Sequence, residues 1–79
     1  MIITFDKNIS LKAKGMYLLL NEMLNNNKII TLDSIREYTT DGETAVRNSI
    51  QELINNNYLE RNMLREKGKI KGVEYKIKK

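Results

Sequence analysis

The sequence contains no cysteine and no histidine. This double absence excludes a disulfide framework, the usual zinc sites, and the Cys–His and Ser–His–Asp groups of nucleophilic catalysis. The sequence also has no glycine-rich motif that would cradle a phosphate. Its nearest approach to a catalytic carboxylate pair is Asp41 with Glu43, which helix capping already explains. We therefore expect no catalytic residues, no cofactor and no metal, and we predict that the protein is not an enzyme.

Long apolar runs are missing as well. None approaches the roughly 18–20 residues that a membrane-spanning helix needs. Residues 1–10 show no basic stretch before an apolar one, which argues against a signal peptide. We therefore expect a cytoplasmic protein with no membrane partner. A chain of 79 residues suffices for one domain at most, so we expect residues 1–79 to form a single domain.

Charge is divided unevenly along the chain. Residues 57–79 carry eight Lys or Arg against three Glu, whereas residues 1–56 carry six Lys or Arg against seven acidic residues. The net charge of +4 therefore originates in the C-terminal stretch. A concentrated basic segment favours an anionic partner, and nucleic acid is the commonest one. Lysines spread evenly over the chain would instead indicate only a soluble surface.

The apolar pattern predicts three helices before this basic stretch. Ser10 is a suitable N-cap for a helix over 11–25, whose inward stripe is Ala13, Met16, Tyr17, Leu20, Met23 and Leu24. Leu11 and Leu18 lie roughly opposite that stripe, so a second cover is needed. It could be residues 1–8, expected as a strand or as an arm packed on the core, or the C-terminal sheet, or another subunit. We expect a homodimer.

The second and third helices follow a short connection. Lys28-Ile29-Ile30 is predicted as a short strand, and Thr31 as the cap of a helix over 32–38. A turn over 39–42 follows, with Thr40 and Glu43 as a capping box for a helix that ends near residue 55. Its inward stripe is predicted to be Val46, Ser49, Ile50, Leu53 and Ile54. The asparagine triplets 25–27 and 55–57 are expected to end the first and third helices.

The C-terminal stretch predicts a β-hairpin. Residues 58–65 form the first strand of this prediction, residues 66–72 the tip, and residues 73–77 the second strand. Val73, Tyr75 and Ile77 alternate with charged residues, as in a half-buried strand. Gly68 and Gly72 are expected to permit the turn at the tip.

With these elements in order, the chain resembles a winged-helix domain. The likeness rests on three stretches: NISLKAKGMYLLLNEM, TLDSIREYTTDGETAVRNSIQELINNNYLER and REKGKIKGVEYKI. It implies an α+β fold, a winged helix-turn-helix of three helices and a C-terminal β-hairpin wing. Similar modules occur in replication initiators and replisome organisers of phages and plasmids of low-GC Gram-positive bacteria. Small winged-helix proteins also serve plasmid partition, conjugative transfer and transcription. Ten Asn, ten Lys and ten Ile fit such an AT-rich coding genome.

The resemblance implies two sets of DNA contacts. The wing set is Arg61, Arg65, Lys67, Lys69, Lys71 and Lys76, which would lie along phosphates or enter an AT-rich minor groove. The alternative is a charged edge that prevents sheet aggregation. The recognition-helix set is Thr44, Arg47, Asn48 and Gln51, residue types that read base edges in the major groove. The alternative here is an ordinary polar helix face.

Other residues are expected to contribute less to DNA binding. Acidic residues near the third helix would repel phosphates, so we expect the wing to provide most of the electrostatic attraction. Lys12 and Lys14 could touch the flanking DNA backbone but are expected to be solvated. The four tyrosines are expected in the core or at its rim, and no run of exposed aromatic residues indicates single-strand binding.

The sequence therefore predicts an accessory factor that binds double-stranded DNA. Larger initiators carry further domains after the wing, which this sequence does not contain, and this favours an accessory role. The expected setting is replication, partition or conjugative transfer of a plasmid or phage. The alternatives are a transcriptional repressor, or a protein-interaction module that does not bind DNA. Other proteins of a DNA-processing complex are further candidate partners.

Overall fold

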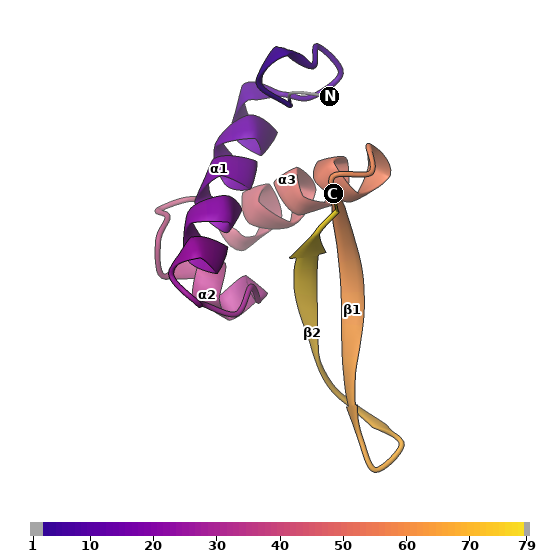
Figure 1. Cartoon of the computed structure of the whole chain (residues 1–79). Helices are drawn as coiled ribbons and strands as arrows, with labels where there is room; N and C mark the ends of the chain where they lie inside the picture. The colour runs from indigo at the N-terminus through magenta and orange to yellow at the C-terminus, as the bar shows by residue number, and fades with distance from the viewer. Residues whose placement is uncertain (1–2, 79) are drawn as a thin grey trace.

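The computed structural model describes residues 3–78, and of Ile70 and Lys71 it describes the backbone alone. Three α-helices are followed by one antiparallel hairpin, as Figure 1 shows. The expected α+β class is therefore confirmed. The bounds are Leu11–Asn25 for α1, Leu32–Arg36 for α2, Glu43–Asn55 for α3, Leu59–Glu66 for β1 and Lys69–Ile77 for β2. A short 3₁₀ helix, Ile3–Phe5, precedes α1.

One hydrophobic core lies between the three helices and the base of the hairpin. Its buried apolar members are Ile9, Ala13, Met16, Leu20, Met23, Ile30, Ile35, Val46, Ile50, Leu53, Leu59 and Tyr75. The predicted inward face of α3 is confirmed, with Ile54 half-buried. On α1 the prediction fails at Leu24, which is exposed. Within residues 3–78, no helix has the length and apolarity needed to cross a membrane.

Both asparagine triplets end their helices in the same way. Asn27 and Asn57 adopt left-handed conformations, with φ of 60° and 66°. The next residue then donates its backbone N–H to the carbonyl five positions earlier, from Lys28 to Met23 and from Tyr58 to Leu53, each at 2.9 Å. This is the Schellman arrangement, and Asn tolerates its left-handed position better than most residues. The predicted ends of the first and third helices are confirmed.

The N-terminal caps agree with the prediction in part. The Ser10 hydroxyl accepts from the Ala13 N–H, as expected. Thr31 caps α2, and Ser34 completes a capping box that was not predicted from the sequence. The predicted box of Thr40 and Glu43 is wrong, because α3 begins after Gly42, which has no side chain for a cap bond. The end predicted for α2 at residue 38 is also wrong. The Tyr38 N–H bonds to the Ile35 carbonyl in a tight turn after Arg36.

Residues 28–30 do not form the predicted strand. The Lys28 N–H is used in the α1 cap, and the Ile29 carbonyl accepts from the Ser34 hydroxyl. One strand-like bond remains, in which the Tyr75 N–H donates to the Ile30 carbonyl at 2.9 Å. This bond attaches the edge of β2 to the helices. Among the described residues of the N-terminal segment, the structure likewise has a 3₁₀ helix instead of a strand, and residues 1 and 2 lie outside the described part.

The hairpin is longer than predicted and its turn is tighter. β1 and β2 pair from Leu59 with Ile77 to Glu66 with Lys69, so the turn is Lys67-Gly68 alone. Both turn residues have positive φ, 53° and 79°, as a type I′ hairpin turn requires. Gly72 lies within β2 opposite Leu64, so its expected role in the turn is wrong. The pairing skips Lys71, which forms a bulge.

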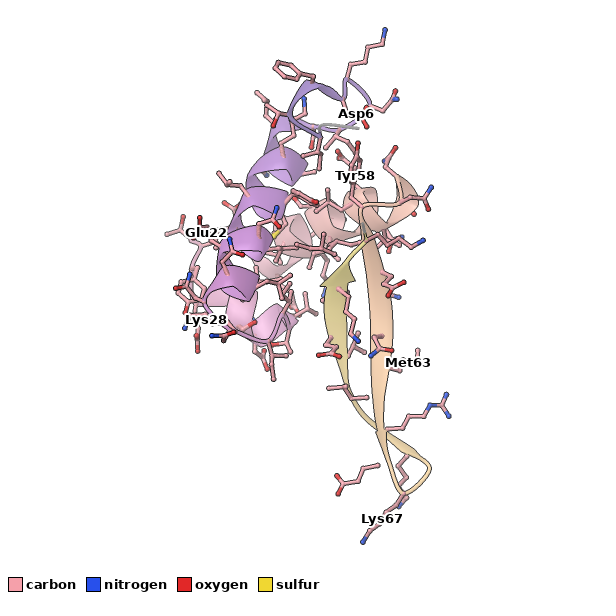
Figure 2. The ribbon with its side chains drawn as sticks, in the orientation of Figure 1. Asp6, Glu22, Lys28, Tyr58, Met63 and Lys67 are labelled. Carbon is pink, nitrogen blue, oxygen red and sulfur yellow. The ribbon has the colours of Figure 1, made fainter. Side chains whose placement is uncertain are left out.

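A hydrogen bond joins the N-terminal segment to the end of α3. The Tyr58 hydroxyl donates to an Asp6 carboxylate oxygen at 2.6 Å, and Figure 2 shows the two side chains together. This bond raises the pKa of Tyr58 to about 12 and lowers the pKa of Asp6 below its ordinary value. The Tyr58 ring also meets the Tyr17 ring edge-on, with centroids 5.8 Å apart. The chain is therefore held at the point where it leaves α3 for the hairpin.

The cap at the end of α3 makes a testable prediction. Asn57→Ala should lower the free energy of unfolding by about 1 kcal/mol, because a β-carbon without a compensating polar group disfavours the left-handed conformation. Asn57→Gly should match or exceed the native stability. Urea denaturation of the three proteins measures both differences. Equal stability of the alanine and glycine variants would contradict the role assigned to the left-handed residue.

The Asp6–Tyr58 bond should make stability depend on pH at both ends of the scale. Asp6 has a lowered folded-state pKa, so its contribution is present above about pH 3.9 and is lost as the pH falls through the folded value. The raised pKa of Tyr58 means that its contribution is complete below about pH 10. That contribution is lost as the pH rises through about 12. Tyr58→Phe should therefore melt below the native protein at neutral pH.

Circular-dichroism melts across this pH range measure the difference between the two proteins. We expect the difference in melting temperature to be largest at neutral pH and to narrow toward both extremes. A difference that stays constant from acid to alkaline pH would show that the bond itself is not the source.

Candidate nucleic-acid interface

The predicted recognition residues share the outward face of α3. Thr44, Arg47, Asn48 and Gln51 are all exposed, because Val46, Ile50 and Leu53 turn the opposite face into the core. The arrangement expected from the sequence is therefore present. Apart from Arg47 at its flank, this set carries no charge, so it offers amide and hydroxyl groups that can hydrogen-bond to base edges.

The charged groups of α3 are already paired within the protein. Arg47 Nη2 lies 3.0 Å from Glu43 Oε1, one helical turn away. The Glu52 carboxylate accepts from the Ser10 backbone N–H and, at 3.0 Å, from the Ser10 hydroxyl. Glu52 therefore fixes the start of α1 against α3. The Gln51 amide donates to the Asn55 side-chain oxygen at 2.8 Å, so Asn55 holds Gln51 in one orientation.

The structure also places Lys12 beside the outward face of α3. Together with Ser10 from the start of α1, Lys12 lines a hollow whose other wall is α3, formed by Thr44, Ala45, Asn48, Ser49 and Glu52. From the sequence, Lys12 was expected to be a solvated surface residue. It is exposed, but the packing of α1 on α3 places it next to two of the predicted base-reading residues.

A groove separates the hairpin from the helices on the other side of α3. Its helical wall contains two arginines, Arg36 from α2 and Arg47 from α3, with Asp33 and Glu43 beside them. Its hairpin wall and remaining lining are Thr31, Leu32, Leu64, Gly72, Val73 and Tyr75. Arg36 was missed by sequence reasoning. Its only signal was that it is the sole basic residue between positions 29 and 46, and nothing in its spacing pointed to the hairpin.

The basic residues of the hairpin fall into two groups. Arg65, Lys67 and Lys69 lie at the turn or next to it, and all three are exposed. Figure 2 shows Lys67 at the far end of the hairpin, away from the helices. We call these three residues the tip cations. Glu66 lies among them, so the charge of the described tip side chains is three positive and one negative.

Arg61 and Lys76 belong to the base of the hairpin. The Arg61 guanidinium lies 6.0 Å from the centroid of the Tyr75 ring, a cation–π arrangement that covers the edge of the core. Lys76 pairs across the hairpin with Glu60, and its Nζ lies 3.9 Å from a carboxylate oxygen of Glu74. Both cations therefore have local partners, and the described side chains of the predicted wing set divide between the tip and the base of the hairpin.

The backbone interrupts the row of alternate lysines that was expected at the tip. Lys67, Lys69 and Lys71 were expected to share one side of an extended tip. The turn at Lys67 and the bulge at Lys71 interrupt the alternation that this expectation required. The backbone of Lys71 lies in β2, and its side chain is outside the described part of the structure.

The aromatic residues are mostly structural. Tyr75 is buried, and Tyr17 and Tyr58 are half-buried, as expected for core or rim positions. Tyr38 is more exposed than predicted, and the Lys28 ammonium lies 5.7 Å from its ring centroid. Hydrogen bonding to the Tyr38 side chain raises the pKa of Lys28 above its ordinary value. This pair lies outside the groove and the hollow that flank α3.

The acidic residues do not form a metal site in the part of the chain that the structure describes, because no three of them gather into a group that could hold an ion. Comparison of the chain with family models, curated proteins and solved structures gives no significant match. These comparisons therefore assign no function, and the candidate DNA contacts are inferred from the geometry and charge of the chain itself.

Proposed function

We propose that this chain is a winged-helix domain that binds double-stranded DNA without catalysing a reaction, with the hairpin as its wing. The observation that carries the proposal is the projection of the tip cations beyond the helical body. Residues 63–69 are exposed, while Leu59 and Tyr75 at the hairpin base are buried in the core. The molecule is elongated as a result, 42 × 27 × 25 Å.

The geometry supports different roles for the hairpin and for α3 in DNA binding. The tip cations attract phosphates, and such contacts give affinity without reading sequence. The outward face of α3 presents Asn48 and Gln51, whose amides suit adenine. Residues 63–66 of β1 span about 13 Å, comparable with the roughly 12 Å width of the major groove. With α3 in the groove, the tip can therefore reach the flanking backbone.

Arg36, Arg47 and Lys12 extend this surface on both sides of α3. The two arginines face the hairpin across the groove, and a DNA strand between helix and hairpin would pass them. Lys12 lies on the opposite flank, beside Thr44 and Asn48. Cations on both flanks suit phosphates on both sides of one groove. The partner class is duplex DNA.

The biological setting follows from the resemblance of the sequence to winged-helix modules of phages and plasmids. We propose an accessory role at a defined site of a mobile element, in replication, partition or conjugative transfer. Transcriptional repression uses the same DNA-binding surface and is the alternative within this class.

One observation favours a function from another class. Leu11 and Leu18 are exposed by 85% and 66% on the outer side of α1. Exposed apolar side chains that share one helix face can contribute to a contact with another protein, so a docking module that does not bind DNA is the second candidate. The two candidates differ in salt dependence, because apolar docking lacks the counterion release that dominates DNA binding.

Salt-dependent binding tests the proposal. Fluorescence anisotropy with duplexes from the DNA flanking the gene should give an affinity that falls steeply with salt, with a log–log slope of about 0.9 for each phosphate contact. Lys67→Ala with Lys69→Ala should lower this slope by about 2 and should weaken binding more than Arg47→Ala does. The reason is that Arg47 is already paired with Glu43.

The matched control is Lys7→Ala with Lys78→Ala. It removes the same charge from residues near the N-terminus and beyond β2, at the end of the hairpin opposite its tip (Figure 1). Equal losses of DNA affinity in both double variants would indicate an effect of net charge alone. Abolition of binding by Arg47→Ala, with normal binding by the tip variant, would overturn the wing-led mechanism. Absence of salt-dependent binding to any duplex would overturn the proposed function.

The Glu43–Arg47 pair gives a prediction of opposite sign. Glu43→Gln removes a negative charge beside α3 and releases Arg47, so DNA binding should tighten by about threefold to tenfold. Glu37→Gln is the control, because Glu37 lies just after α2 and outside the groove lining. Anisotropy titrations at one salt concentration compare the two variants. Unchanged or weaker binding of Glu43→Gln would exclude Arg47 as a latent phosphate contact.

A further inference from the structure

The side of α1 opposite the core carries an uncovered apolar stripe. Leu11 and Leu18 are two helical turns apart and therefore lie on one face. Their exposed fractions of 85% and 66% are among the largest of the described apolar side chains. The core stripe of α1, which contains Met16 and Leu20, lies on the opposite face. Three covers for this face were compatible with the sequence, and of the described residues neither 3–10 nor the hairpin covers these two leucines.

A hollow lies beside Leu18 on the same face. It is lined by Ile3, Thr4, Lys14, Gly15, Tyr17, Leu18 and Asn21. A β-carbon at Gly15 would meet no atom within 4 Å, and the φ of Gly15 is not positive. Neither crowding nor backbone conformation therefore requires glycine at this position, although glycine weakens a helix interior. Its effect on the outer surface is to leave room next to a projecting leucine.

The charges around Leu18 are arranged with opposite sign on its two sides. Lys14 precedes Leu18 by four residues and Glu22 follows it by four. Figure 2 shows Glu22 on the flank of α1 that faces away from the hairpin. If a second α1 runs antiparallel across Leu18, each Lys14 lies level with the Glu22 of the other helix. This self-complementary pattern is what an interface with two-fold symmetry requires.

We propose that this face binds a second copy of the same chain, with the two α1 helices antiparallel and crossing at Leu18. Leu18 of each copy packs against Leu18 of the other, and each Leu11 lies near the C-terminal end of the other α1. The gap at Gly15 admits the approaching helix, and two Lys14–Glu22 pairs flank the contact. An unrelated protein would have to supply matching charges, whereas a second copy carries them already. The hairpins lie on the other side of each copy (Figure 1), so this contact leaves the tip cations accessible.

Sedimentation velocity without DNA tests the proposal. The native chain should change from a 9.3 kDa monomer to a species of twice that mass as concentration rises. Leu18→Glu should weaken this association about a hundredfold, roughly tenfold for each of the two copies in a dimer. Ile29→Glu is the matched control, because Ile29 is also exposed, by 64%, but lies outside α1. It should dimerise as the native chain does.

A charge swap identifies the partner as a second copy. Lys14→Glu alone places two carboxylates opposite each other at both ends of the contact, and Glu22→Lys alone places two ammonium groups there. Each single variant should therefore dimerise more weakly than the native chain. In a mixture of the two single variants, residue 14 of each variant faces a residue 22 of opposite charge in the other variant. Both pairs are then attractive, so the mixture should form a mixed dimer. The double variant, which combines Lys14→Glu with Glu22→Lys, keeps the native net charge and should recover self-association.

Folding of the charge variants is followed separately. Lys14 lies near Asp6 and contributes to the lowering of the Asp6 pKa, so its replacement could also affect the N-terminal segment. Thermal melts of each variant therefore accompany the sedimentation measurement. Leu18→Glu leaves the charge of Lys14 in place, so its effect on association does not depend on a change at Asp6.

The expected and the contradicting outcomes are distinct. Loss of association in Leu18→Glu, normal association in Ile29→Glu, and recovery in the mixture and in the double variant support the proposal. A native chain that stays monomeric at every concentration overturns it. So does a dimer that Leu18→Glu leaves intact, or single charge variants that associate as well alone as when mixed.

Discussion

The position of the hairpin depends on the burial of its base. Leu59 and Tyr75 belong to the same buried cluster as Leu53 of α3 and Ile30 of the connection between α1 and α2. The Tyr75 N–H bond to the Ile30 carbonyl adds a directional link to this apolar contact. A two-stranded hairpin is marginally stable alone, so it needs this packing to keep a fixed direction. Without it, the tip cations would have no defined place relative to α3.

The same packing separates two kinds of surface chemistry. On α3, Glu43 is paired with Arg47, and Glu52 with the start of α1. The uncharged amides that remain suit hydrogen bonds to bases more than attraction to phosphates. At the other end, the tip cations project away from the core, where the local acid count is low. The overall charge of +4 is therefore presented mainly by the hairpin, and the proposed mechanism places affinity there and sequence reading on α3.

The proposed dimer would make DNA binding depend on the spacing between two DNA sites. The outer face of α1 and the tip of the hairpin lie on different sides of the molecule (Figure 1), so a dimer formed through Leu18 leaves both tips free. Two linked copies bind two adjacent DNA sites more tightly than either copy binds one, provided that the spacing of the sites matches. The affinity gained from the second copy would then compensate for the weak attraction between each α3 face and the DNA phosphates.

The amino-acid sequence alone predicts the order of the three helices and the hairpin, both ends of α1, the start of α2 and the end of α3. The asparagine triplets and Ser10 specify their boundaries through local backbone geometry, and the apolar spacing of α1 and α3 specifies which faces are buried. The exposure of Thr44, Asn48 and Gln51 follows from that same periodicity. These features depend on neighbours within about one helical turn, which is why they could be predicted without the fold.

Which of these residues share a surface depends on the tertiary packing. Arg36 joins Arg47 opposite the hairpin, and Lys12 joins Asn48, because helices distant in sequence pack together. The tight turn and bulge of the hairpin divided a basic stretch that looked uniform into tip and base. Residues 28–30 show the same limit, since their strand-like spacing could not reveal that the α1 cap and Ser34 use their backbone groups. Such outcomes depend on contacts across the chain, which local spacing does not encode.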